Sequence, residues 1–294
     1  MNDIINKQNE PASLAKLKAQ RKLYRQTKCI VGLSFALLIL PVVFGNFLKF
    51  WLNGDEAYMR SLVLYSAIAA ILKLFANNLE KQKKSKAAMI QQSFDSYIFG
   101  LPWKKYWGRK PTSDEINSIA HNETDKDLRD WYEPLIYKAN QNQGILLCQL
   151  ENIHYDSQLK KSYYHHVSIF FWIFIGLIVL LGAFYFEKTI YGFVLYAIIP
   201  LSPLFIWYIN AQNNKESEIE HKQKLEELSA DAWDKMLNSQ EIPLSDLLAI
   251  QDTLLQYRKT SNAVPDLYYK LMRNKLEGVA YESSKERLHE LKII

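Results

Sequence analysis

Two long apolar runs near the middle of the chain limit most strongly what it can fold into. They fill the stretch from His166 to Ile209 and are separated only by the charged pair Glu187-Lys188. Each has about twenty residues, the length that a helix needs to cross the hydrocarbon core of a bilayer. No Asp, Glu, Lys or Arg lies between His166 and Glu187, whereas a surface helix of a soluble protein keeps one polar face. The sequence therefore predicts a transmembrane helical hairpin at 166–209.

A second pair of apolar runs lies nearer the N-terminus and predicts another hairpin. Its first run, 29–52, contains Pro41, which should kink the helix or mark its outer end. Its second run, 57–79, contains Arg60 and Lys73. Long basic side chains can extend along a helix to the membrane surface, and this accounts for both residues. Alternatively, Lys73 faces the interior of the helix bundle or an aqueous path and takes part in gating.

Basic residues flank the predicted spans on one side. Residues 1–28 contain seven Lys or Arg against two acidic residues, and four lysines lie within 81–86, directly after the second span. Positive residues next to membrane spans accumulate on the cytoplasmic side. Four crossings then leave both termini and the middle of the chain in the cytoplasm, so we expect a multi-pass protein of the cell inner (plasma) membrane.

The predicted fold class is all-α, an integral membrane protein with two transmembrane helical hairpins and a helical cytoplasmic body. The chain divides into five expected parts. They are a basic cytoplasmic N-terminal helix at 1–28, the first transmembrane hairpin at 29–79, a cytoplasmic middle segment at 80–165, the second hairpin at 166–209, and a cytoplasmic C-terminal helical segment at 210–294.

Local signals predict where helices begin and end in the cytoplasmic segments. Gly100 should end the helix that follows the second crossing. Thr112, with Glu115 three residues later, is typical of a capped helix start. Ser245 is the expected cap of the penultimate helix, and Pro265-Asp266 should start the last one.

The sequence contains no motif typical of a catalytic, metal or cofactor site. Its ten glycines form neither a dinucleotide-binding nor a P-loop pattern. The six histidines do not pair at metal-ligand spacing, and the two cysteines lie far apart. The net charge of +5 is concentrated at the N-terminus, without a broad basic face for DNA or RNA. We therefore expect no enzyme, no metal, no cofactor and no direct nucleic-acid partner.

Aromatic and basic residues alternate at three places in the cytoplasmic segments, within 103–109, at 131–132 and within 257–273. Flat rings stack on nucleobases and arginines bind phosphates, so these clusters are candidate sites for an anionic nucleotide. The alternatives are ring packing at the membrane interface or in a core, and ion pairing of the arginines within the C-terminal helices. The candidate ligand-binding residues are Trp103, Arg109, Trp131, Tyr132, Arg258, Tyr268 and Arg273.

Two prolines, Pro200 and Pro203, lie within the fourth predicted crossing. Each removes a backbone donor and disturbs the preceding helical turn. They predict a kink, which is either static and packed against the third crossing or a hinge that takes part in gating.

Four stretches follow one another in a fixed order after the first hairpin: FDSYIFGLPW, DWYEPL, CQLENIHYDSQLKKSYY and IQDTLLQYRKTSNAVPDLYYKLMR. Together with the hairpins, they resemble the SMODS-associating four-transmembrane effector family over about 21–282. In that family, Cys-Gln is commonly followed by Arg, then by Asn and a Trp-Asp pair. In this chain Leu150, Asn152 and Tyr155-Asp156 stand at those places, so the resemblance leaves open any role that rests on that arginine.

The resemblance implies a role in bacterial anti-phage defence through cyclic-oligonucleotide signalling. A partner nucleotidyltransferase would make a cyclic di- or trinucleotide, and the effector would bind it and disrupt the inner membrane, causing abortive infection. A homo-oligomer in the lipid bilayer is expected. From the residues, a membrane-anchored scaffold or sensor partner without pore activity stays open as an alternative. A small transporter is disfavoured because the spans contain almost no ionisable residues near the membrane midplane.

Overall fold

The computed structural model describes residues 2–51, 55–185, 199–238 and 240–293. All regular elements in these ranges are helices, which confirms the all-α prediction for the described residues. The first long pair consists of α2 (Pro11–Trp51) and α3 (Asp55–Phe99), and the second of α5 (Gln141–Tyr185) and α7 (Ile199–Leu237). At about 1.5 Å per residue, each of these helices is roughly 60 Å long, about twice the thickness of a bilayer core.

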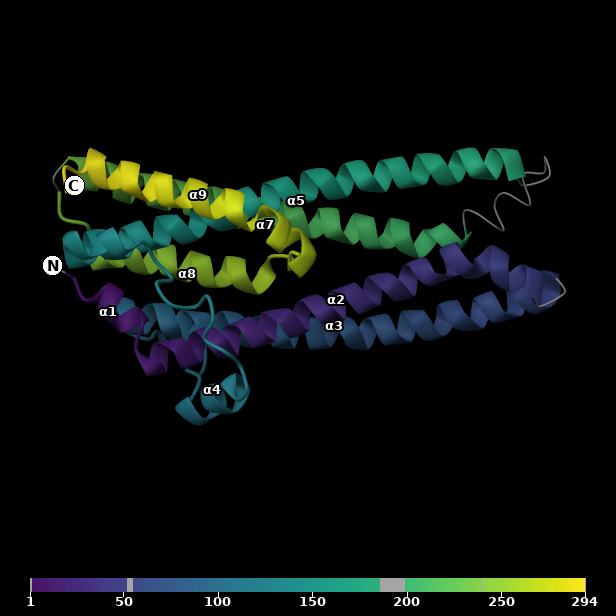
Figure 1. Ribbon diagram of the computed structural model, residues 1–294, viewed down its shortest axis with the longest axis horizontal. Helices are drawn as coiled ribbons and strands as arrows, with labels where there is room; N and C mark the ends of the chain where they lie inside the picture. The colour runs from purple at the N-terminus through teal and green to yellow at the C-terminus, as the bar shows by residue number, and fades with distance from the viewer. Residues whose placement is uncertain (1, 52–54, 186–198, 239, 294) are drawn as a thin grey trace.

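The two long pairs lie side by side along the longest axis of the molecule (Figure 1). Two C-terminal helices, α8 (Leu244–Thr260) and α9 (Asp266–Glu290), gather at the same end of the molecule as both chain termini. The short helix α1 (Ile4–Gln8) also lies there, and α4 (Ser113–Ala120) packs against α2. This end is called the body below.

The helices run through the expected segment boundaries without a break. Helix α2 is continuous across residue 28 and through Pro41, and α3 is continuous across residue 79. Likewise α5 crosses the boundary at residue 165 and α7 the boundary at residue 209. Each long helix therefore belongs both to the body and to a predicted crossing.

None of the helices, as far as their residues are described, has a stretch that is both long and apolar enough to qualify as a membrane span. The predicted crossings lie partly outside the described residues, since 52–54 fall in the first hairpin and 186–198 in the second.

Most predicted helix ends are confirmed. Helix α3 ends at Phe99, and Gly100 has a φ of +70°, a left-handed conformation that glycine adopts at low cost. Thr112 and Glu115 form a capping box at the start of α4. The prediction for Ser245 is wrong: α8 begins at Leu244 after an N-cap at Pro243. The Ser245 hydroxyl donates to the neighbouring Asp246 instead, at 3.2 Å.

One apolar core fills the body. Its fully buried side chains include Phe94 of α3, Leu146 of α5, Leu225 of α7 and Leu255 of α8. A separate small cluster joins Ala19 and Leu23 of α2 to Ile116 of α4. Because every long helix contributes to this packing, the body holds the two hairpins together.

Basic residues of α2, expected as a membrane flank, have partners within the body. Arg21 donates to the carbonyl of Lys126 at 2.6 Å, and Lys22 donates to that of His121 at 3.3 Å. Arg25 pairs with Glu123 at 2.6 Å. These contacts hold the segment after α4 against α2, so this part of the positive charge has a structural role.

Candidate functional site

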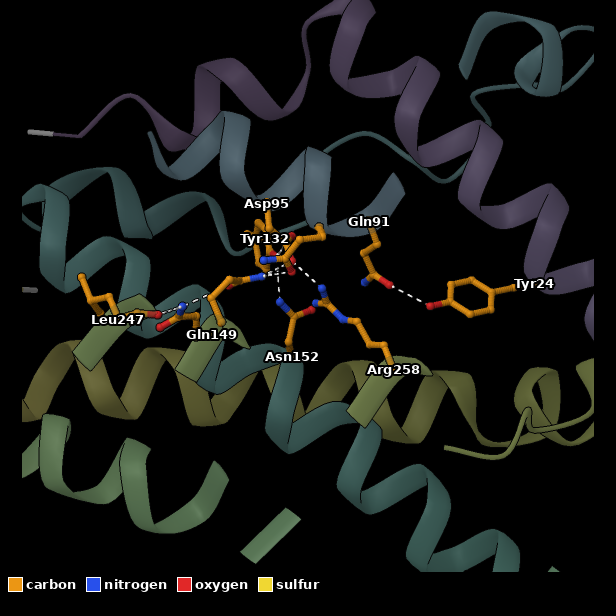
Figure 2. Close-up of polar contacts among 10 residues, drawn as sticks. Tyr24, Gln91, Asp95, Tyr132, Gln149, Asn152, Leu247 and Arg258 are labelled. Carbon is orange, nitrogen blue, oxygen red and sulfur yellow. Dashed lines mark hydrogen bonds and ion pairs between the residues drawn. The ribbon is translucent and has the colours of Figure 1, made fainter. Parts of the chain in front are cut away.

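Two opposite charges meet in the core of the body. Asp95 of α3 is fully buried, and the side chain of Arg258 of α8 is only 9% exposed. Arg258 Nη1 donates to Asp95 Oδ2 at 2.6 Å (Figure 2). Burying one of these charges without the other would be costly, so each residue depends on its partner.

Two further side chains donate to the Asp95 carboxylate. Gln251 Nε2, about two helical turns before Arg258 on α8, lies 2.9 Å from Asp95 Oδ2 and also 2.9 Å from Gln92 Oε1. The Tyr132 hydroxyl donates to Asp95 Oδ1 at 3.2 Å. The carboxylate therefore accepts three hydrogen bonds, which compensate for much of its lost hydration.

Helix α5 joins the same network. Gln149 Nε2 donates to the carbonyl of Leu247 at 2.9 Å and to Gln251 Oε1 at 3.0 Å. Asn152 Nδ2 donates to the Tyr132 hydroxyl at 2.7 Å. Figure 2 shows these side chains converging from α3, α5 and α8 and from the loop before the short 3-10 helix η2 (Pro134–Lys138). We call this set the Asp95 network.

A further hydrogen bond extends from α3 toward α2. The Tyr24 hydroxyl donates to Gln91 Oε1 at 3.2 Å (Figure 2). Burial raises the pKa of Tyr24 above its ordinary value. This phenol therefore stays neutral and ties α2 to the residue beside Gln92.

Burial and charge set the ionisation of the Asp95 network. Burial, together with the nearby Asp95 carboxylate, raises the pKa of the Tyr132 hydroxyl well above its ordinary value. Burial by itself would lower the pKa of Arg258, but attraction to Asp95, the influence of Tyr132 and Tyr24 and the hydrogen bond to Asp95 together raise it. Tyr132 is thus a neutral donor and Arg258 a permanent cation.

Not every polar atom in the network has a partner. Arg258 Nη2, Gln92 Nε2 and Gln149 Oε1 are buried and have no hydrogen-bond partner among the described residues. Unpartnered buried polar atoms raise the free energy of a structure. A different arrangement of α3, α5 and α8, or a polar ligand between them, would lower this cost.

The structure brings two of the predicted ligand-binding residues together, Tyr132 and Arg258, both in the Asp95 network. Their interactions are with other residues of the chain. Binding of a phosphate by Arg258 stays a prediction. The observed partner of Arg258 is the carboxylate of Asp95. This corresponds to the alternative role of ion pairing, although the pair joins α8 to α3 instead of staying within the C-terminal helices.

The aromatic-basic cluster at 103–109 forms a small surface structure. Trp103 is half-buried, and its Nε1 donates to the carbonyl of Gly108 at 2.9 Å. Arg109 is exposed and pairs with Glu115, which also caps α4. Trp131, half-buried, packs against the edge of the core. These three residues do not join Tyr132 and Arg258 in the Asp95 network.

The other predicted residues lie elsewhere in the chain. The Tyr268 hydroxyl of α9 donates to Ser162 Oγ of α5 at 2.8 Å. Lys73 is half-buried in the part of α3 beyond the body. The backbone at Pro200 and Pro203 belongs to α7, while the side chains of both prolines and of Arg273 lie outside the described residues.

Sequence reasoning missed most of the Asp95 network. Asp95 stands between Phe94 and Ile98, and Gln149 follows the run ILLC, so each is a polar residue within an otherwise buried stretch. Gln251 likewise lies among the leucines of α8. Single polar residues on apolar helix faces were the available signal, because such residues are stable in a core only when they have partners.

The fold and the network define a class: a helical protein in which two long hairpins are joined through a buried polar junction. The chain belongs to the SMODS-associating 4TM effector domain family, whose sequence model matches residues 2–286. It is also 22% identical over 281 residues to a protein of Bacillus cereus (strain VD146) named "Probable CBASS effector molecule". That alignment covers 92% of this chain and 94% of the relative. No solved structure matches the chain.

The family match confirms the resemblance seen in the four motif stretches. All four stretches quoted for it contribute to the Asp95 network: Asp95 comes from the first, Tyr132 from the second, Gln149 and Asn152 from the third, and Gln251 and Arg258 from the fourth.

Proposed function

We propose that this protein is a cyclic-nucleotide-activated membrane effector of bacterial anti-phage defence, which disrupts the inner membrane and causes abortive infection. Family membership supports the effector role and a partner nucleotidyltransferase of the SMODS type. The name of the Bacillus cereus relative supports the assignment to CBASS, the cyclic-oligonucleotide-based defence. No catalytic step is part of the proposal.

Exposed apolar side chains beyond the body are the observation that carries the membrane location. On α3, Leu74 and Phe75 are 67% and 66% exposed. On α5, Phe170 and Trp172 are 66% and 60% exposed. Apolar surfaces of this extent rarely face water and are typical of membrane or protein interfaces. The description of the family as four-transmembrane agrees with the four expected crossings.

When α5 packs against α7, part of the apolar surface of α5 stays exposed. Phe171 is buried and stacks on Tyr208 with ring centroids 3.9 Å apart and planes 3° from parallel. Phe170 and Trp172, on either side of Phe171, stay largely exposed, although the Trp172 ring still meets Tyr208 edge-on at a centroid distance of 6.2 Å. Lipid would contact their exposed faces.

Continuous helices provide the route from ligand binding to membrane disruption. The Asp95 network joins α3 and α5, and both helices extend from the body into the apolar region. A ligand that binds one arrangement of the body more tightly would shift these helices together. Lys73, Pro200 and Pro203 stay the proposed gating residues, and a homo-oligomer the proposed active form.

Dye release from reconstituted vesicles tests the proposal. The purified protein would be inserted into phosphatidylethanolamine and phosphatidylglycerol vesicles that contain a self-quenched dye. Cyclic dinucleotides and cyclic trinucleotides would then be added separately. We expect release with at least one of them and none with a linear dinucleotide. Inserted protein that binds a cyclic nucleotide without releasing dye would instead support the scaffold or sensor partner.

A further inference from the structure

A groove lies on the outside of α3 where the helix leaves the body. It has a volume of about 570 Å³. Helix α3 contributes Lys81, Ser85, Lys86 and Met89, the segment before α4 contributes Arg109, and the first turn of α4 contributes Glu115. With three cations and one carboxylate among these residues, the groove has an excess of positive charge.

The lysines of the groove differ from a neighbouring lysine that is used structurally. Lys84 is buried, donates to the carbonyl of Ser261 at 3.1 Å and lies 3.9 Å from Glu80. Lys81 and Lys86 are exposed, and no ion pair joins either of them to another described residue. Their charges are therefore available to an anion from outside the chain.

The third cation of the groove is held in place. Arg109 pairs with Glu115, and the Glu115 carboxylate also accepts from the backbone N–H of Thr112 at 3.0 Å. Because the capping box fixes this carboxylate, the guanidinium is positioned before a ligand arrives, which lowers the entropy cost of binding.

The position of the groove along α3 places it at the expected membrane surface. Lys81 is two residues past Leu79, the expected inner end of the second crossing, and Met89 is ten residues past it. At about 1.5 Å per residue, these positions lie roughly 3 Å and 15 Å beyond the hydrocarbon boundary. The headgroup layer on each side of a bilayer is about 5–8 Å thick. The end of the groove at Lys81 therefore lies within this layer.

The lining chemistry favours a lipid headgroup over a nucleotide. Ammonium and guanidinium groups bind phosphate oxygens, and the Ser85 hydroxyl can donate to them. No aromatic ring is among the described residues that line the groove, whereas nucleotide sites use rings as stacking platforms. The alkyl part of Lys81, nearest the hydrocarbon boundary, offers contact to glycerol and the first acyl carbons.

We propose that this groove binds the phosphate of an anionic phospholipid headgroup, such as that of phosphatidylglycerol, from the inner leaflet. The proposal rests on the proposed membrane location. It adds that the protein binds a specific lipid at the junction between body and membrane, where α4 is held against α2.

Native mass spectrometry of the detergent-solubilised full-length protein tests the site. The parent is titrated with phosphatidylglycerol and with zwitterionic phosphatidylcholine. We expect the parent to prefer phosphatidylglycerol, and Lys81→Gln with Lys86→Gln to bind it about thirtyfold more weakly, since each basic group near a headgroup contributes on the order of a fivefold factor. The matched control is Lys138→Gln with Lys224→Gln, two exposed lysines away from the groove, which should bind like the parent.

Three outcomes would overturn the proposal. They are equal affinity of the parent for both lipids, unchanged phosphatidylglycerol binding by the groove variant, and displacement of the bound lipid by a soluble cyclic dinucleotide, which would make the groove a nucleotide site. Carbonate extraction of cell membranes separates this result from the proposed function. Protein released by carbonate contradicts the membrane location itself, whereas embedded protein without a lipid preference contradicts only the groove.

Discussion

Arg258 Nη1 lies 2.6 Å from Oδ2 of Asp95, although the two residues are 163 positions apart in the chain. Asp95 belongs to α3, which continues into the first hairpin, and Arg258 belongs to α8, which follows the second. The pair is buried on both sides. One ion pair thus connects the two halves of the molecule inside the body.

Removing one charge of this pair should destabilise the protein strongly. Asp95→Asn leaves the Arg258 cation buried without a counter-charge, and we expect a loss of about 3–5 kcal/mol in the free energy of unfolding. Urea unfolding in detergent, followed by tryptophan fluorescence, measures it. Arg129→Gln is the control, because Arg129 and its partner Asp125 form a pair exposed on both sides and worth under about 1 kcal/mol. Equal effects of the two variants would contradict a structural role for Asp95.

The Tyr132 hydroxyl should contribute separately from its ring. Tyr132→Phe keeps the ring next to Phe99, at a centroid distance of 5.9 Å, but removes the hydrogen bonds with Asp95 and Asn152. We expect a loss of about 1–3 kcal/mol, because buried polar atoms lose their partner. Tyr137→Phe, at an exposed position, should change stability by less than about 0.5 kcal/mol. If Tyr132→Phe lost no more stability than Tyr137→Phe, the Tyr132 hydroxyl would be dispensable.

Stability of the body should fall as the pH rises toward neutrality. Burial raises the pKa of Glu151 on α5 to about 7 from an ordinary value of 4.5. Between these values the folded protein binds more protons than the unfolded chain, so raising the pH favours unfolding. The stabilisation is fully present below about pH 4.5 and is lost by about pH 7.

Glu151→Gln tests the assignment, because it cannot titrate. Melting temperatures measured from pH 5 to pH 8 should fall less steeply in this variant than in the parent. Glu227→Gln, which alters an exposed glutamate of α7, should follow the parent. An unchanged slope in Glu151→Gln would assign the pH dependence to other groups.

Topology reporters should show both termini on one side. An enzyme reporter fused after Ile294 or inserted near Thr124 should be active in the cytoplasm, and one inserted near Gly54 should be active outside, because basic residues flank the inner ends of the spans. Each fusion is compared with a soluble cytoplasmic and a secreted form of the reporter. An external signal from the Ile294 fusion would be incompatible with four crossings.

The two prolines of α7 should affect permeabilisation more than binding. Replacing Pro200 and Pro203 by Ala restores two backbone donors and removes the ring clashes. If they form a hinge, the double variant should insert and bind the activating cyclic nucleotide like the parent but release less dye. Leu201→Ala with Leu204→Ala is a control for side-chain loss in the same stretch. If the proline variant released as much dye as the parent, the two prolines would have no role in gating.

Local features of the chain allowed several parts of the fold to be predicted from sequence. Gly100 ends α3, Thr112 and Glu115 cap α4, and Pro265 precedes α9, since each signal acts within one helical turn. The Ser245 prediction failed because α8 begins two residues earlier than expected. Pro243 is its N-cap, and Ser245 lies within the first turn. The motifs likewise sufficed for the family, because they are contiguous in the sequence.

The sequence by itself determined the helical class, the long apolar runs and most helix ends, because helical periodicity and capping depend on neighbouring residues. Only the tertiary structure decided that Asp95 meets Arg258, that Gln149 meets Gln251, and that Lys84 donates to Ser261 whereas no ion pair joins Lys86 to another described residue. These outcomes depend on how α3, α5 and α8 pack. Packing places residues in contact according to helix faces and crossing positions, which spacing along the chain does not encode.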